Sequence, residues 1–465
     1  MRKSIIATST AALILSMLPH SADAASAGKK CSKRGVERVV GNTTLVCSGK
    51  NKLTWKRKSN NVKPKSVAAP SPSPIASPSR TPTPAKSDLP KESGAELLSA
   101  ANSCKLATPQ QRVYSNIDFG FPKSDELHPS KGEFRILLIS VDFLNNRGKV
   151  SPEENGKPYA QDFISYWEET SRGLLKFSVD NLGQWISLPK RASDYAGNWP
   201  YREMDDYAQE VLNLADPLVD FSKYSIVAII PPSDVKDFFS SGPVLAYGKY
   251  EKFKTNDGPV LNLTVAPEPK YPMGGVKWLW LAHEVGHILG LGHPHDYQGN
   301  IVELMSIFSL MDAGFVAPGL YGWERWRMDW LLESEIRCVN SESIQKEIIH
   351  RLSPLGSNSG TQIGVVKLNE FEAVVFENRR RTKFDLLPEI YEGLLVYHVN
   401  SAKSEGAITP VLAESFLIDY SKPNYNGTRV VGTLKVGQSV TFRGINLKVL
   451  AGDGNSLYVQ VKKTN

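Results

Sequence analysis

A proline-rich stretch between residues 62 and 90 limits how this chain can fold. It holds eight of the chain's 30 prolines, interleaved with Ser, Thr and Ala. Proline lacks a backbone N–H and restricts φ, so such a stretch stays extended instead of joining a helix or a sheet. We therefore predict a linker over residues 62–100, with separately folded parts before and after it.

Residues 1–24 have the pattern of a secretory signal peptide. Arg2 and Lys3 give a basic start, residues 5–18 are mostly apolar, and Ala22 and Ala24 fit the rule for cleavage between small residues. We expect cleavage after Ala24 and a secreted protein, either extracellular or associated with the cell surface. The sequence has no run of 18 apolar residues, so no transmembrane segment is expected.

Residues 25–61 are predicted to form a small basic module with two cysteines. Residues 25–65 hold twelve Lys and Arg and one acid, Glu37, whereas the whole chain has a net charge of +7. The chain beyond this segment is therefore net acidic, which argues against a nucleic-acid partner. Short strands are expected over 37–40 and 43–47. The module either binds an anionic cell-wall or surface polymer through residues 25–65 or is a solvated spacer.

Export permits disulfide bonds, and four cysteines can pair in three ways. Cys31 and Cys47 lie close together in the basic module, so locality favours a bridge between them. Cys104 and Cys338 then remain, and their bridge would tie the start of the large domain to its end. A zinc site made of these cysteines is the weaker alternative, because no Cys-x-x-Cys pair occurs.

Beyond the linker, the hydrophobic pattern predicts an α/β or α+β domain over residues 101–340. Apolar runs typical of strands lie at 134–143, 175–179, 184–188, 225–230 and 260–265. Helical spacing predicts helices at 95–101, 160–171, 202–214 and 276–289. Residues 341–465 are predicted to form a C-terminal β-sandwich-like domain, with strands at 364–368, 372–377, 393–399, 439–442, 447–450 and 457–461.

The chemistry is carried by residues 283–293, which read His-Glu-Val-Gly-His-Ile-Leu-Gly-Leu-Gly-His. His283 and His287 are four residues apart, so on a helix both face the same way and can bind one Zn²⁺. Gly290 lets the chain leave the helix sharply, and His293 then supplies a third imidazole. Three imidazoles leave one position for water, which is the catalytic arrangement of zinc. His295 is the alternative third ligand.

Glu284 stands beside the first histidine and is the expected catalytic residue. Its carboxylate can take a proton from water at the metal while that water attacks a carbonyl. It would then pass the proton to the leaving amine. The expected activity is that of a zinc metalloendopeptidase, a hydrolase whose partner is a protein or peptide substrate.

The motif resembles that of the metzincin class of zinc proteases. This class also has a tight turn with a methionine beneath the zinc, and residues 309–314 fit it, with Met311 eighteen residues after His293. Met305 is the alternative. The resemblance implies a metzincin-like catalytic domain. The class often supplies a tyrosine past the methionine, for which Tyr321 is only a candidate.

The chain is more narrowly similar to immune inhibitor A-type secreted bacterial metalloproteases, over roughly residues 130–465. The similarity rests on the stretches 309–332, 220–224 and 376–379, followed by Asp385 and residues 393–398. Many members of that family have Asp where this chain has His293, so the ligand set is closer to that of metzincins in general.

Two further functions stay open at this point. One is a zinc amidase that acts on wall peptides. The other is a surface-binding protein whose protease fold is vestigial, which the presence of Glu284 argues against. The sequence also leaves open whether Ca²⁺ supports the loops and whether a pro-segment within 91–130 is removed.

Overall fold

The computed structural model describes residues 37–40, 43–48, 53–57, 89–109, 117–195, 202–238, 240, 242–268, 276–294, 308–312, 319–385, 387, 389–403, 406–411 and 432–464. The chain divides into two compact units, residues 1–80 and 81–465. The predicted signal peptide, Cys31 and nearly all of the proline-rich stretch lie outside the described residues. No helix in the described part of the chain is long and apolar enough to cross a membrane.

The first unit contains a three-stranded antiparallel sheet of β1 (Glu37–Val40), β2 (Thr43–Ser48) and β3 (Thr54–Arg57). The two strands predicted over 37–40 and 43–47 are confirmed, and β3 adds a third. Leu45, Cys47 and Trp55 form its small core. Cys47 is disulfide-bonded.

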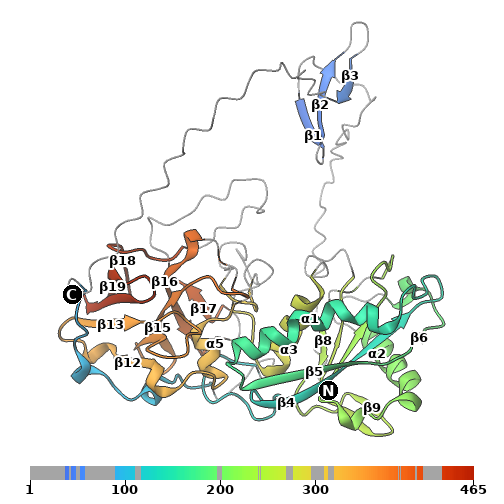
Figure 1. Cartoon of the computed structure of the whole chain (residues 1–465), viewed down its shortest axis with the longest axis horizontal. Coiled ribbons are helices and arrows are strands. Elements are labelled where there is room, and N and C mark those ends of the chain that lie inside the picture. The colour runs from blue at the N-terminus through green and yellow to red at the C-terminus, as the bar shows by residue number, and fades with distance from the viewer. Residues whose placement is uncertain are drawn as a thin grey trace, which may run out of the picture. The chain divides into compact units, whose positions relative to one another are not determined.

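The N-terminal half of the second unit is a mixed sheet of order β5-β4-β7-β11-β8 (Figure 1). Its strands are β4 (Gly132–Asp142), β5 (Leu175–Asn181), β7 (Ile226–Ile230), β8 (Val244–Ala246) and β11 (Leu263–Val265). All neighbours are parallel except β11 and β8, which are antiparallel. The short β6 (Ile186–Ser187) pairs with the end of β4, and β9 (Phe253–Thr255) forms a separate hairpin with β10 (Gly258–Val260).

Helices cover both faces of this sheet, which is why β7 is buried along its whole length and β4 from Ile136 onward. Ile136 and Leu138 of β4 share one core with α1 (Pro152–Thr170) and α3 (Lys277–Leu289). Leu137 and Ile139 point to the opposite face, where they share a core with α2 (Arg202–Ala215). The alternation follows from the two-residue period of a strand.

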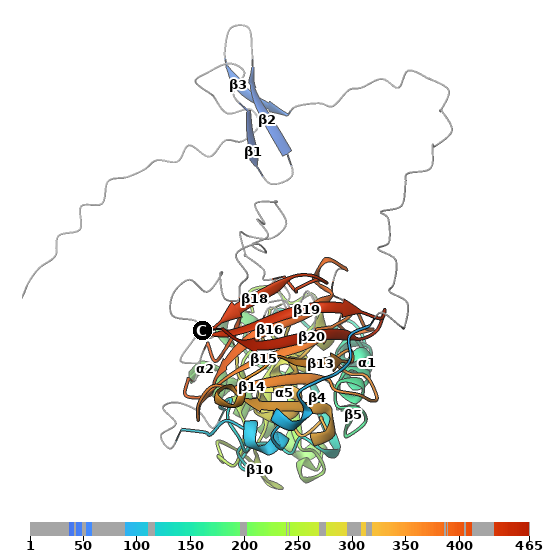
Figure 2. The same ribbon diagram turned by 90° about the vertical axis from the view of Figure 1, so that its left-hand side faces the viewer.

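Two sheets dominate the C-terminal half (Figure 2). The first has the order β12-β14-β15-β16-β17 and the second β13-β20-β19-β18. Their bounds are β12 (Ile336–Asn340), β13 (Ile348–Leu352), β14 (Ile363–Lys367), β15 (Glu372–Arg379), β16 (Gly393–Asn400), β17 (Ile408–Pro410), β18 (Ser439–Phe442), β19 (Ile445–Gly452) and β20 (Leu457–Lys463).

The first C-terminal sheet lies between two cores. Val374 and Phe376 of β15 share a core with the second sheet. Ala373 and Val375 point the other way, toward Trp323 of α5 (Gly322–Arg327). The C-terminal half therefore packs directly on the helix that follows the predicted metal site, and the second unit as a whole is of mixed α/β class with several sheets.

Residues 89–109 belong to this C-terminal half, because they pair with its strands. Ser93 bridges to Ile349 and Ser99 to Cys338, and Cys104 forms the predicted disulfide with Cys338. The single helix predicted over 95–101 is wrong. Two 3₁₀ turns, Ala95–Leu97 and Ala101–Cys104, flank an extended segment instead. The pairing of Ser99 with a strand requires that extended backbone.

Two other predicted elements differ from the structure. The helix expected to begin at residue 160 begins at Pro152, because the Ser151 side chain accepts a hydrogen bond from the Glu154 N–H and caps it. The strand expected over 260–265 is split into β10 and β11. Asn262 interrupts it, since its side-chain amide donates to Ser225 O and its oxygen accepts from Gly248 N.

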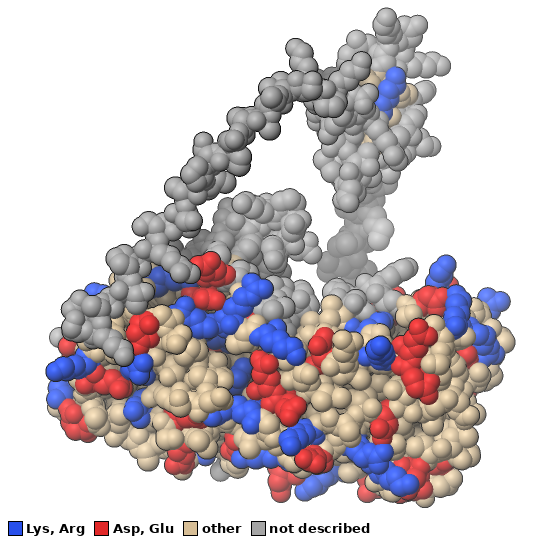
Figure 3. Space-filling model, in the orientation of Figure 1, with Lys and Arg blue, Asp and Glu red and all other residues tan. Residues whose placement is uncertain are grey.

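The surface of the second unit is mixed in charge. On the face drawn in Figure 3, basic and acidic side chains are interspersed over both halves. This pattern agrees with the net acidic balance of the chain beyond residue 65 and differs from the run of basic residues in the first unit.

Candidate metal centre

Helix α3 presents His283 and His287 on one side, as the four-residue spacing predicts. The helix is apolar on most of its surface and lies against the mixed sheet, so ten of its thirteen residues are buried. The His283 side chain is buried and that of His287 is half-buried. A pair of imidazoles on a buried helix is thus fixed in direction by the packing around it.

Gly290 ends α3 and turns the chain back toward these histidines. Its φ is +98°, a backbone conformation that strains residues with a Cβ atom. A Cβ atom at this position would also lie 2.6 Å from the Leu127 side chain. The turn places the Nε2 atom of His293 3.0 Å from that of His283 and 3.1 Å from that of His287.

Backbone carbonyls determine which nitrogen of two of these rings carries a proton. His283 Nδ1 lies 2.9 Å from Leu310 O, and His287 Nδ1 lies 2.8 Å from Leu291 O. A carbonyl oxygen only accepts hydrogen bonds, so in both rings Nδ1 carries the hydrogen. In the neutral rings, Nε2 is left with its lone pair, which is the state in which imidazole binds a metal.

The three histidines fit a divalent metal ion. Their ligand atoms all lie within 4.8 Å of one another. Nitrogen lone pairs that face each other at 3.0–3.1 Å repel unless a cation, or a proton on His293 Nε2, lies between them. Three nitrogens that each bind zinc at about 2.0–2.1 Å need to be roughly 3 to 3.5 Å apart, which is close to what is found here. The predicted ligands are therefore brought together, although the geometry does not identify the metal.

Met311 lies directly beneath α3. It is fully buried, and a Cβ atom at Gly286 would lie 2.5 Å from its sulfur, so only glycine lets the methionine pack this closely. The residue before it, Leu310, supplies the carbonyl that orients His283. The turn with Met311 is thus in contact with the first predicted ligand, as the sequence motif indicates.

Glu284 points toward the edge of the sheet. It is 8% exposed, and its carboxylate accepts a hydrogen bond from the backbone N–H of Val244 in β8. One turn earlier, Trp280 Nε1 donates to Gly242 O at 2.9 Å. Burial raises the pKa of the Glu284 carboxyl well above its usual range, although the Val244 N–H lowers it. A nearby cation would also lower it.

A buried polar cluster beneath the Met311 turn was missed by the sequence analysis. The Ser309 hydroxyl donates to Glu324 at 2.9 Å and accepts from the Met311 N–H at 3.1 Å. Burial raises the pKa of Glu324 to about 8, although hydrogen bonds from Tyr321 N–H and Ser309 lower it. Glu324 follows Trp323 in a Trp-Glu-Arg-Trp-Arg run, and charges within so aromatic a stretch are the signal that could have revealed the cluster.

Arg379 of β15 holds the loop that contains Met311 at both of its ends. Its fully buried guanidinium donates to Phe308 O at 3.0 Å and to Leu320 O at 3.2 Å. It is also paired with Glu377 and Asp385. A side chain from the C-terminal sheet therefore fixes the loop on which His283 depends.

The remaining sequence candidates are placed as follows. Tyr321 is fully buried, and its ring packs against Tyr397 at a centroid distance of 4.8 Å, inside the C-terminal core. His295, the alternative ligand, and Met305, the alternative methionine, lie outside the described residues.

The sequence was compared with protein-family models and with curated proteins. The chain matches no protein-family model and no curated protein.

Proposed function

We propose that this protein is a zinc-dependent endopeptidase. The observation that carries the proposal is the convergence of three imidazole Nε2 atoms, two of them oriented by Nδ1–H bonds to backbone carbonyls. Three histidine ligands with an open fourth position are the donor set of catalytic zinc. The half-buried state of His287 and His293 leaves the site accessible to a substrate.

The residues around the site have separate tasks in this proposal. His283, His287 and His293 would hold the zinc ion, which when bound would supply a Lewis acid for the peptide carbonyl and for a water that is to be deprotonated. Glu284 accepts the proton of that water and then donates it to the leaving amine. Its burial and its bond to Val244 N–H keep the carboxylate in one orientation.

The edge of the mixed sheet is the proposed binding surface for the substrate backbone. Residues 260–265, which are predicted as one strand, do not form this edge, because β11 lies between β7 and β8. The edge is β8, which is also the strand whose Val244 N–H contacts Glu284. An extended peptide that pairs with β8 would therefore lie next to the general base.

Two finer assignments belong to the proposal. A metzincin-like site is supported by Met311, which packs against Gly286 beneath α3. Export is supported by the buried Cys104–Cys338 disulfide, since such bonds persist mainly in oxidising compartments. Ca²⁺ has no support among the described residues, where the histidine triad is the one candidate metal group found.

The variant Glu284→Gln tests the proposal. It is expected to bind zinc as the wild type does but to lose at least 10²-fold in the rate of hydrolysis of a casein-like substrate, since general-base catalysis contributes 10²–10⁴-fold. Glu133→Gln, which changes an exposed acid on β4, is the control. Near-full activity of Glu284→Gln would remove it from the mechanism. Wild-type hydrolysis of wall peptides alone would favour the amidase.

A further inference from the structure

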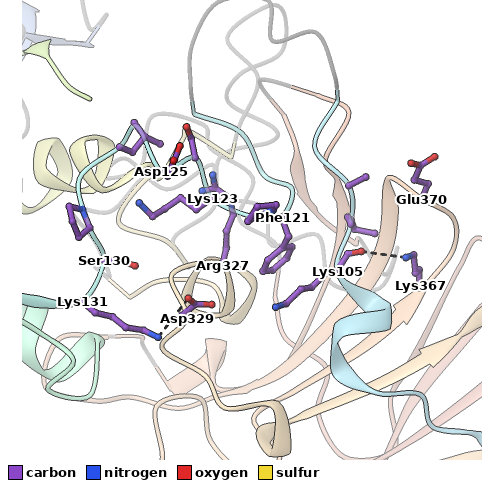
Figure 4. Close-up of a pocket in the computed structure, with 16 residues that line it drawn as sticks. Lys105, Phe121, Lys123, Asp125, Ser130, Lys131, Arg327, Asp329, Lys367 and Glu370 are labelled. Carbon is purple, nitrogen blue, oxygen red and sulfur yellow. Dashed lines mark hydrogen bonds and ion pairs between the residues drawn. The ribbon is translucent and has the colours of Figure 1, made fainter. Parts of the chain in front are cut away.

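The second unit contains a cavity that none of the three histidines lines. Its volume is about 890 Å³, and its lining comes from residues 105–107, the segment 121–131, Arg327, Asp329, Lys367 of β14 and Glu370 after that strand (Figure 4). Part of its wall is apolar, made by Leu106, Phe121, Pro122, Leu127 and Pro129. A cavity of this size accommodates several groups of a ligand.

Three ammonium groups in the wall of this cavity form no salt bridge within the described part of the chain, although Asp329 and Asp125 attract the charge of one of them, Lys123. Lys123 Nζ donates to His128 O at 2.8 Å, and Lys367 Nζ donates to Ser103 O at 2.9 Å. Lys105 Nζ lies 5.5 Å from the centre of the Phe121 ring. No ion pair joins these three lysines to any acid among the described residues. Their positive charge is therefore available to a ligand.

The acidic side chains in the wall limit how many negative charges a ligand of this cavity can carry. Lys105 and Lys131 approach the cavity from opposite sides, and Asp329 lies near Lys131, with which it pairs at 3.7 Å (Figure 4). Asp125 and Glu370 also line the cavity. Acids interleaved with lysines would repel a polymer with a charge at every unit. They favour a ligand with one or two negative charges next to apolar groups.

Arg327 contributes positive charge, but its guanidinium N–H groups already donate hydrogen bonds within the protein. Its Nε donates to Gly120 O, one terminal nitrogen to Gly290 O and the other to Asp118. The remaining cations are ammonium groups, which act as single point charges and do not bind an anion bidentately. Burial, aided by the charge of Arg327, lowers the pKa of Lys123 to about 8, so a bound anion would stabilise its charged form.

We propose that this cavity is a binding site for an acidic side chain of the peptide substrate. The inference rests on the proposed peptidase function and adds a substrate class to it, that of peptides with an acidic and apolar segment. Leu127 and Lys123 pack against Gly290, the residue that begins the turn to His293. Two residues that line the cavity thus lie against the turn that carries the third predicted ligand, which is the link between the cavity and the metal centre.

Direct binding tests this inference without hydrolysis. The full chain with Glu284→Gln is titrated into a labelled nonapeptide with a central Asp-Glu pair, and into the same peptide with Asn-Gln, by fluorescence anisotropy. The acidic peptide is expected to bind at least tenfold more tightly. Adding Lys105→Gln and Lys123→Gln should remove most of this preference. Lys176→Gln on β5, an exposed lysine paired with Glu133, should leave it unchanged.

Two outcomes would overturn the inference. One is equal binding of both peptides, or a preference that survives both lysine substitutions. The other is displacement of the acidic peptide by polyphosphate at lower concentration than by free acidic peptide, which would indicate a site for polyanions. Lys123 also donates a hydrogen bond to His128 O, so its substitution can disturb the local structure. Lys105→Gln alone is therefore the second variant, and it should weaken binding of the acidic peptide at least threefold. Acidic preference without any wild-type hydrolysis would refute the peptidase and leave the cavity site standing.

Discussion

At the scale of single residues, two backbone carbonyls decide what the histidine motif can do. Leu310 O and Leu291 O each take the Nδ1–H of one histidine and leave its Nε2 free for a metal. Without them either ring could adopt the other tautomer or turn away. The ligand set depends as much on these carbonyls as on the imidazoles.

Removing one ligand should abolish tight metal binding. Loss of a residue that only supports a ligand typically lowers metal affinity 10–100-fold. We expect His287→Ala to lower zinc affinity by more than this, because it removes a ligand itself and leaves only two imidazoles. Competition with a chelator measures the dissociation constant, and His398→Asn, a change on β16, is the control. Zinc content unchanged in His287→Ala would refute the ligand assignment.

A second residue-scale prediction concerns acid stability. His350 of β13 is 2% exposed, and burial, with Arg337 acting in the same direction, lowers its pKa to about 4. In the unfolded chain it titrates near 6.5, so below that pH the unfolded state binds a proton that the folded state does not. Above about pH 6.5 the ring is neutral in both states and its burial does not make stability depend on pH. As the pH falls from there toward 4, the free energy of unfolding decreases.

His350→Gln should make that loss smaller. A single histidine contributes at most about 1.4 kcal/mol per pH unit to the slope, and the variant should lack this contribution. Denaturant unfolding of both proteins at pH 7 and pH 5 measures the difference. His128 is present in both proteins, and burial lowers its pKa to about 4 as well. Part of the dependence of the free energy of unfolding on pH should therefore remain in the variant. Identical slopes would contradict the prediction.

At the scale of elements, the turn with Met311 is held by a strand that comes much later in the chain. Arg379 of β15 binds the carbonyls of Phe308 and Leu320. Glu324 of α5 binds Ser309, which in turn binds the Met311 N–H. The position of Leu310 O, and with it the orientation of His283, is therefore set jointly by α5 and β15.

Arg379→Lys should weaken zinc binding without unfolding the protein. The ammonium keeps the charge next to Glu377 and Asp385, so no buried carboxylate is left alone, but it cannot also hold both carbonyls. We expect a 10–100-fold loss of zinc affinity, the usual cost of losing an outer-shell partner. The affinity is measured well below the melting temperature of each protein. Arg351→Lys, which alters an exposed pair with Asp453, is the control. Wild-type affinity in Arg379→Lys would limit Arg379 to a role in stability.

At the scale of the whole molecule, the chain combines two units of different charge. The first 80 residues form one compact unit, and residues 81–465 form the other. The basic segment lies in the first, whereas the histidines and the Cys104–Cys338 disulfide lie in the second. We propose that the basic module anchors the protein to an anionic wall polymer while the second unit carries the chemistry.

A shortened chain that begins at Ser87 tests this division. It should keep wild-type zinc affinity and peptide hydrolysis, because all the removed residues except 81–86 belong to the other compact unit. Its retention on isolated cell walls should fall. For the full chain, retention should weaken steeply between 0.01 and 0.5 M salt, over which the Debye length shortens severalfold. Retention that is unaffected by both shortening and salt would make the module a spacer. Lost hydrolysis would show that the catalytic unit needs it.

What the sequence determined by itself was local. The helix predicted over 276–289 is α3 (Lys277–Leu289), and the strand predicted over 134–143 is β4 (Gly132–Asp142). Hydrophobic period and motif spacing suffice for such elements, because the spacing of apolar residues along the chain follows the geometry of the helix or strand itself. The grouping of His283, His287 and His293 followed for the same reason, since a helix and one glycine turn connect them.

Only the tertiary structure decided which strand is the edge of the sheet and what supports the metal site. The strand β8 is the edge because β11 inserts between it and β7, an order that no local pattern records. Arg379 reaches Phe308 across 71 residues of chain, and it is stable in the interior only because Glu377 and Asp385 meet it there. Such contacts arise from the packing of distant segments, so the sequence shows the charged residues but not the partners that make their burial possible.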